Sequence, residues 1–316
     1  MSNFFIVAKQ VCILFVLIGA GAACRRFKVL DDPAVKGMVD VLVLIVTPCL
    51  IVDVFQRPFD KGMLVQLAYA FAIAVAAHLA LIAVAGAVFR RERRSSACVL
   101  KLASVFSNAG FMGIPLEQAI LGEKGVFFGI VYVAVFNLFI WSWGLREMAG
   151  AATDEAERRK TLRTMFLNPG TVGLALGLVF FLTSSRLPPG IAEGAGMMAS
   201  MNTPLAMLVI GYYLAGAKLG AILKFPAAYI AAAIRLVLYP LAFTGAMFAL
   251  RKWLDRDAML ALVTAASAPV AAMTSMFAAK FKRDVDLSVA LVSGTTLLSV
   301  VTMPAVIAFA MAVLQR

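Results

Sequence analysis

The stretch Asn108-Ala-Gly-Phe-Met-Gly-Ile-Pro115 interrupts an otherwise apolar segment with an asparagine, two glycines and a proline. A second apolar segment is interrupted by Ser267-Ala-Pro269, and the polar pair Thr274-Ser275 follows. Proline removes a backbone donor and disturbs the preceding helical turn. At membrane depth, freed backbone groups are tolerated only where they are buried in protein or face a watery cavity. The two stretches therefore predict a pair of broken helices that share one polar site.

The composition places most of the remaining chain in a membrane. Hydrophobic residues make up 62% of the 316 residues and charged residues only 15%, which excludes an ordinary soluble domain. A spanning helix needs about 20 apolar residues, so we predict an all-α integral membrane protein with ten transmembrane helices. The expected spans are 4–24, 38–57, 63–89, 97–121, 126–148, 166–184, 197–219, 225–249, 258–280 and 286–312.

The formal net charge of +12 is explained by membrane topology rather than by a nucleic-acid partner. Lys and Arg are concentrated in the connections that follow the odd-numbered spans. Such connections stay cytoplasmic, so both termini are expected outside, and the basic loops are expected to face anionic lipid of the bilayer. Trp141 and Trp143, near the predicted inner end of the fifth span, fit an interfacial aromatic belt.

The charged connection at 149–165 divides the chain into two halves, 1–148 and 166–316, each with five expected spans. An odd number of spans per half forces the second half to insert upside down relative to the first. Weak internal similarity supports this division, because Thr47-Pro48 is matched by Thr203-Pro204 at the corresponding place in the second half. We therefore predict two inverted five-helix repeats, a recurrent design of secondary transporters, joined by a cytoplasmic linker.

Polar residues at the breaks and on flanking helices are the candidate substrate-binding residues. A helix that starts after a break points its amides and its positive dipole end at an anion. Asn137 in the fifth span and Ser293 and Thr295 in the tenth are placed to complete such a site, although each taken singly is more often an interhelical hydrogen bond. The full set is Ser107, Asn108, Ala109, Gly110, Pro115, Asn137, Arg235, Ser267, Pro269, Thr274, Ser275, Ser293 and Thr295.

Ionisable residues within the spans leave several roles open. Arg235 lies near the middle of the eighth span, where insertion costs about 2.5–3.5 kcal/mol, so it either attracts the anion or serves in a structural pairing. His78 is the only histidine, which excludes a multi-histidine metal site. A hydrogen-bonded interior role is favoured for it over a proton-responsive one. Few acidic residues lie at depth, so neither H⁺ nor Na⁺ coupling is compelled, and no cofactor is predicted.

At these residues the chain resembles the auxin efflux carrier family, which includes plant auxin carriers and bacterial malonate or malate permeases. The resemblance covers nearly the full length. It implies ten spans in inverted repeats with crossed broken helices 4 and 9, as in bile acid/sodium symporters, an elevator mechanism and a homodimer. It also implies that Asn108 helps to hold the substrate carboxylate. The motifs are Phe106–Pro115, Leu167-Asn-Pro-Gly170, Asn202-Thr-Pro-Leu-Ala206 and Ser267-Ala-Pro269.

The functional hypothesis is a secondary active transporter of a small organic anion, a mono- or dicarboxylate such as malonate or malate. The absence of the long central cytosolic loop of long plant carriers favours a compact permease of a bacterial inner membrane. The spans hold no His-Glu-x-x-His motif and no nucleophile with a matching base, so an enzyme is not predicted. A membrane sensor of the same fold that binds a ligand without moving it is the alternative.

Overall fold

The computed structural model describes residues 2–150, 167, 169–216 and 225–314. Across these residues the regular secondary structure is helical, as predicted, apart from one isolated bridge pair. Within the same ranges, six helices are long and apolar enough to cross a membrane. They are Asp32–Phe55, Lys61–Val88, Ala109–Ala149, Pro189–Ala215, Pro226–Ala249 and Val285–Leu314.

The first half of the chain contains seven α-helices interrupted by three π-helical turns, within the described residues. The α-helices are α1 Ser2–Arg26, α2 Asp32–Val41, α3 Thr47–Phe55, α4 Lys61–Val88, α5 Arg94–Val105, α6 Ile114–Phe139 and α7 Leu145–Ala149. The π-helical turns are η1 Leu42–Val46, η2 Ala109–Gly113 and η3 Ile140–Gly144.

The second half follows the predicted linker 149–165, most of which lies outside the described residues. Its helices are α9 Pro169–Thr183, α10 Pro189–Ser200, α11 Asn202–Ala215, α12 Pro226–Ala233, η5 Ile234–Leu238, α13 Tyr239–Ala249, α14 Arg256–Ser267, α15 Met273–Lys280 and α16 Val285–Leu314. In this half the expected span 258–280 consists of two separate helices, α14 and α15, with a non-helical segment between them.

The expected spans 97–121 and 126–148 meet at a glycine turn inside α6. Gly122 has φ +65° and ψ −152°, a conformation that side chains with a Cβ rarely adopt. The chain therefore turns at Gly122, and α6 consists of two arms, 114–121 and 123–139. The first arm falls within the expected span 97–121, and most of the second arm falls within the expected span 126–148.

Three of the π-helical turns end two residues before a proline. η1 precedes Pro48, η2 precedes Pro115 and η5 precedes Pro240. Proline lacks the amide of a regular helical ladder, and its ring crowds the carbonyl four residues back. A wider π turn at that point accommodates both defects within a continuous helix. Proline thus explains where these helices are locally distorted.

Helix pairs approach closely at glycines. α1 packs along α11, and a Cβ added at Gly21 or at Gly211 would overlap a backbone carbonyl of the other helix. α9 packs on α3 through Gly173 and Gly177 in the same manner, because a Cβ added at these positions would lie 3.1 and 3.0 Å from the nearest atoms of α3. Small residues let backbones approach closely where apolar surface alone does not drive helix association.

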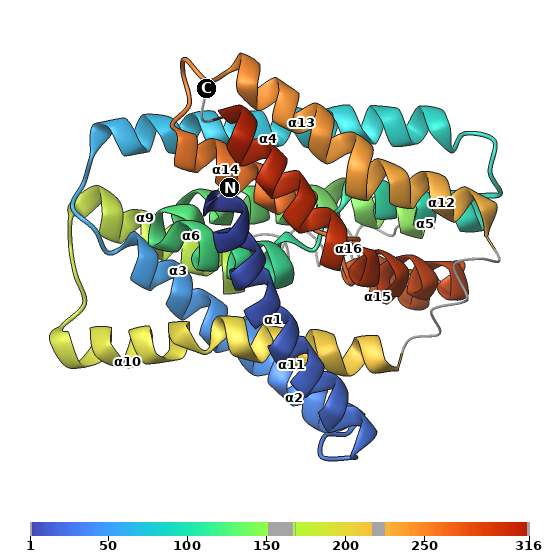
Figure 1. Cartoon of the computed structure of the whole chain (residues 1–316), viewed down its shortest axis with the longest axis horizontal. Helices are drawn as coiled ribbons and strands as arrows, with labels where there is room; N and C mark the ends of the chain where they lie inside the picture. The colour runs from blue at the N-terminus through green and yellow to red at the C-terminus, as the bar shows by residue number, and fades with distance from the viewer. Residues whose placement is uncertain (1, 151–166, 168, 217–224, 315–316) are drawn as a thin grey trace.

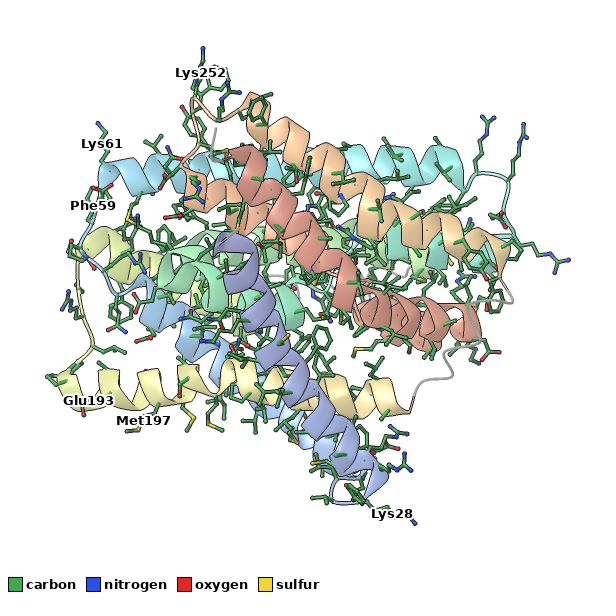
Figure 2. All side chains as sticks on the ribbon, in the orientation of Figure 1. Lys28, Phe59, Lys61, Glu193, Met197 and Lys252 are labelled. Carbon is green, nitrogen blue, oxygen red and sulfur yellow. The ribbon has the colours of Figure 1, made fainter. Side chains whose placement is uncertain are left out.

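Figure 1 shows α4 and the α12–α13 pair along one side of the molecule and α10–α11 along the opposite side, with α5, α6 and α14 between them. In Figure 2, Lys61 and Lys252 lie toward one end of the molecule and Lys28 toward the other, and all three side chains point outward. The helices that carry the predicted breaks therefore occupy the interior, where their freed backbone groups need partners.

Candidate functional site

The two predicted breaks lie side by side and pair with each other. The Asn108 amide donates to the Pro269 carbonyl at 2.7 Å, and the Ala271 amide donates to the Phe106 carbonyl at 2.9 Å. Ser107 and Val270 thereby form an antiparallel bridge. Unpaired backbone groups in an apolar interior cost several kcal/mol or so. Each break therefore supplies the hydrogen-bond partners that the other one needs.

Proline explains why α14 stops at this crossing. Ala268, the residue before Pro269, has φ −63° and ψ 149°, the extended conformation that a following proline favours. The next amide, that of Val270, donates to the Thr295 hydroxyl of α16 at 3.1 Å. The same hydroxyl donates to the Leu291 carbonyl at 2.7 Å. Thr295 thus holds the second break in place from the neighbouring helix.

The helices that precede the two breaks, α5 and α14, both have their C-terminal ends at the Arg235 side chain. This fully buried side chain donates to the carbonyls of Ser104 and Val105 at the end of α5, at 3.4 and 3.1 Å, and to that of Ala266 near the end of α14. Its guanidinium carbon also lies 4.8 Å from the ring centre of Tyr239. A cation at a helix C-terminus is favoured by the helix dipole. Arg235 therefore neutralises two helix ends at once.

The helices that follow the breaks begin at a cavity of about 250 Å³. On one side the helical ladder starts with the amides of Met112 and Gly113, which both donate to the Asn108 carbonyl at 2.9 and 3.4 Å. The amides of Ala109, Gly110 and Phe111 precede that ladder. On the other side α15 begins at Met273, which lines the same cavity. Two helix N-termini, with their positive dipole ends, thus meet at one cavity.

Polar side chains in the cavity wall are neutral. In the part of the chain that the structure describes, no Lys, Arg, His, Asp or Glu lines the cavity. The wall combines the two breaks with parts of η1, α3, α6, α9 and α11. Its polar side chains are Thr47, Ser107, Asn108, Asn137 and Asn202. Its larger apolar side chains include Leu50, Ile51, Phe111, Ile130, Phe136, Trp141, Leu174, Met273 and Met276.

Four of the thirteen candidate residues line this cavity: Ser107, Asn108, Gly110 and Asn137. The others lie around the crossing or farther along the same helices. Ser267 donates to the Thr264 carbonyl at 2.8 Å, and Thr295 and Arg235 bond the crossing as described. The remaining candidates, which are also absent from the cavity wall, are Ala109, Pro115, Pro269, Thr274, Ser275 and Ser293. The binding roles of all thirteen stay predictions.

Thr47, Trp141 and Asn202 also line the cavity, although they were not among the candidates. Thr47 and Asn202 belong to the Thr-Pro and Asn-Thr-Pro motifs that carried the internal similarity, so that repeated pattern was the available signal. Trp141, expected in an interfacial aromatic belt, lies in the cavity wall and packs edge-on against Phe277 at 5.4 Å. Its position near a span end did not reveal the packing around it.

Among the described residues, three with a charged or imidazole side chain are fully buried: His78, Arg235 and Glu117. His78 Nδ1 lies 2.8 Å from the Ala74 carbonyl, and its ring stacks on Phe139, which suits the hydrogen-bonded interior role expected for it. Glu117 differs, because neither carboxylate oxygen has a hydrogen-bond partner. It lies near the end of the expected span 97–121, where sequence alone does not distinguish a buried acid from an interfacial one.

A family model described as membrane transport protein matches residues 6–307. The chain belongs to this family. These are membrane transporters and not enzymes, and the resemblance to auxin efflux carriers is confirmed. The family places the chain among integral membrane proteins, in agreement with its six long apolar helices across the described residues.

A more distant similarity agrees with the family. An uncharacterized transporter of Methanothermobacter thermautotrophicus is 28% identical over 207 residues. The match covers 65% of this chain and 65% of the relative, so the chain spans slightly less than two thirds of the length of that relative.

Proposed function

We propose that this membrane transport protein family member is a secondary active transporter of a small organic anion, a mono- or dicarboxylate such as malonate or malate. The observation that carries the proposal is the meeting of two helix N-termini, those of η2 and α15, at one cavity beside Asn108. Backbone amides and positive dipole ends bind a carboxylate without a charged side chain.

The cavity suits a small solute. Its volume of about 250 Å³ is below the roughly 300–1,000 Å³ of pockets for drug-sized ligands. The side-chain amides of Asn108, Asn137 and Asn202 offer donors for carboxylate oxygens, and apolar side chains make up most of the wall around them. Because no cationic side chain lines the described wall, the bound anion is held only by helix dipoles and neutral donors. The attraction is therefore weak enough for the anion to be released.

An elevator mechanism is the proposed mode of transport. The cavity wall comes partly from the two crossed breaks and partly from α3, α9 and α11. In the proposed cycle, the crossed helices move as one body against these three helices and carry the anion across. The tight backbone pairing at the crossing favours a body that moves as a unit. Ten spans in two inverted repeats, 1–148 and 166–316, and a homodimer built on the static helices complete this proposal.

The proposed location is a bacterial inner membrane with both termini outside. The opposite positions of Lys28 and of the pair Lys61 and Lys252 support this topology, because Lys28 follows the first span and the other two lie at predicted outer connections (Figure 2). The larger share of Lys and Arg then faces the cytoplasm, as the positive-inside rule requires.

Reconstituted transport tests the proposal. Purified protein in proteoliposomes is expected to take up radiolabelled malonate or malate with saturation, and Asn108→Ala is expected to abolish that uptake while the protein remains folded. Ser142→Ala is the matched control, because this exposed hydroxyl bonds only a carbonyl of its own helix, that of Leu138 at 2.6 Å. Normal uptake by the Asn108 variant would remove the site assignment.

Tracer counterflow separates transport from the alternative, a membrane sensor of the same fold. A transporter exchanges labelled anion outside for unlabelled anion inside. A sensor binds the anion and shows a thermal shift, but no label enters the vesicle.

A further inference from the structure

Glu117 is a buried acid without a described partner. Its side chain is 0% exposed, and both carboxylate oxygens lack a hydrogen bond. In the described chain, the other two fully buried residues with a charged or imidazole side chain, His78 and Arg235, both bond backbone carbonyls. An ionised carboxylate in such surroundings is strongly disfavoured, so a buried acid of this kind holds a proton or a cation.

The space for this carboxyl group is made by glycines. A Cβ added at Gly129, on the second arm of α6, would collide with the Glu117 carboxylate. A Cβ at Gly113 would lie 3.6 Å from Glu117 Oε1 and 3.3 Å from the Cα of Ala265 in α14. Glu117 therefore lies between the two arms of α6, next to the broken helix α14. It belongs to the group of crossed helices, not to the lipid-facing surface.

The charged groups that neighbouring helices bring toward α6 are engaged elsewhere. Arg57, two residues after the end of α3, pairs with Glu123 at 3.5 Å, and Asp257 of α14 pairs with Lys124 at 3.6 Å. Among the described residues, Glu117 has no hydrogen bond to any titratable group on these helices. Lys9 of α1 and Arg256 of α14 are exposed, Asp53 of α3 is half-buried, His78 of α4 bonds Ala74, and Tyr212 of α11 donates to Asp32.

A proton suits this site better than a metal cation. Hard cations such as Na⁺ and Ca²⁺ need a shell of several oxygen ligands. Among the described residues no group of three or more His, Cys, Asp or Glu side chains is placed to hold a metal ion. A proton needs only one carboxylate oxygen, with which it forms an O–H bond that breaks again on release.

The helix that carries Glu117 begins at the anion cavity. The Asn108 carbonyl accepts the first two hydrogen bonds of the helix that continues through Ile114 to Glu117, and Ile114 itself lines the cavity. A negative charge at Glu117 opposes an anion at the start of the same helix, and a proton on the carboxylate removes that repulsion.

We propose that Glu117 is the proton-binding site that couples anion transport to a proton gradient, by symport. The inference rests on the proposed function. The proton adds to the carboxylate when the anion enters the cavity, crosses with it on the moving helices, and leaves on the opposite side.

The test uses proteoliposomes with radiolabelled malonate or malate and the variant Glu117→Gln, which imitates the protonated side chain in shape and charge. In wild-type protein an inside-alkaline gradient of one pH unit is expected to raise anion accumulation about tenfold for one coupled proton. A pH-sensitive dye in the lumen is expected to report proton entry with the anion. In Glu117→Gln this gradient-driven accumulation is expected to be lost, whereas counterflow exchange persists.

Glu123→Gln is the control, because Glu123 is an exposed acid on the same helix that pairs with Arg57. It is expected to keep both gradient-driven accumulation and exchange. The proposal is overturned if Glu117→Gln accumulates anion with the gradient as wild type does, if it loses exchange as well, or if wild-type uptake moves no protons or follows a sodium gradient instead. Failure of the proposed function looks different: wild-type protein then shows neither exchange nor uptake of any carboxylate.

Discussion

Arg235 Nη1 donates to the carbonyl of Val105 at 3.1 Å and so places a permanent positive charge at the C-terminus of α5. The same guanidinium bonds the carbonyl of Ala266 near the end of α14. The two broken segments therefore have a defined polarity. Their C-terminal ends share one buried cation, and the N-terminal ends of the following helices share one cavity whose described side chains carry no charge.

Replacing Arg235 is expected to destabilise the crossing. Arg235→Met leaves the carbonyls of Val105 and Ala266 buried without a donor, and each such group costs about 1–3 kcal/mol, so we expect a loss of about 2–6 kcal/mol in unfolding free energy. Arg235→Lys keeps the positive charge but lacks the planar guanidinium fork, so its stability should lie between those of the wild type and Arg235→Met. Thermal unfolding in detergent measures the effect.

Arg251→Met is the matched control, because the exposed Arg251 side chain contacts only Phe248 near the end of α13, through its carbonyl at 3.1 Å and through its ring. Surface substitutions of this kind change stability by about 0.5 kcal/mol or less. Equal stability of the two Met variants would contradict the structural role. An Arg235→Met protein that folds normally but no longer transports would assign Arg235 to the substrate instead.

Asn202→Ala is expected to weaken anion binding. Asn202 is 5% exposed in the folded chain and lines the cavity opposite the breaks. A hydrogen bond to a charged group contributes about 1.5–3 kcal/mol, so the KM for uptake should rise about 10-fold or more. Ser200→Ala on the preceding helix is the control, because this exposed hydroxyl bonds the nearby Met197 carbonyl. An unchanged KM in Asn202→Ala would exclude Asn202 from the anion site.

Gly211→Ala is expected to disturb the contact between α1 and α11. The added methyl group would overlap the carbonyl of Ile18, and overpacking of this kind costs about 1–3 kcal/mol. Gly19→Ala on α1 is the control, because a Cβ there meets nothing within 4 Å and alanine favours a helix. Thermal unfolding should therefore show a lower Tm for Gly211→Ala only. A similar Tm for both variants would mean that the two helices are not closely packed.

The membrane helices and their breaks could be predicted from the sequence, because both depend on the chemistry of neighbouring residues. Twenty or so apolar residues in a row are long enough to cross a bilayer wherever they occur, so the helical, membrane-embedded character followed from composition. The breaks followed from Pro269 and from the Gly- and Pro-rich stretch after Asn108, because the missing amide of proline acts on its own turn. Ser107 and Asn108, which line the cavity, were among the candidates for the same reason, because they directly precede one of those stretches.

Contacts between distant segments were decided only by the tertiary structure. Arg235 was an interior charge with two open roles, and its position at the ends of α5 and α14 depends on how three helices pack. Asn202 and Thr47 reach the cavity from helices that carry no break. Glu117 is enclosed because Gly129 and Gly113 leave room for it across a turn and an interface. Hydropathy and helix breaks depend on residues that are neighbours in the sequence. Burial and hydrogen-bond pairing depend on which helix faces pack together, and residues far apart in the sequence determine that packing.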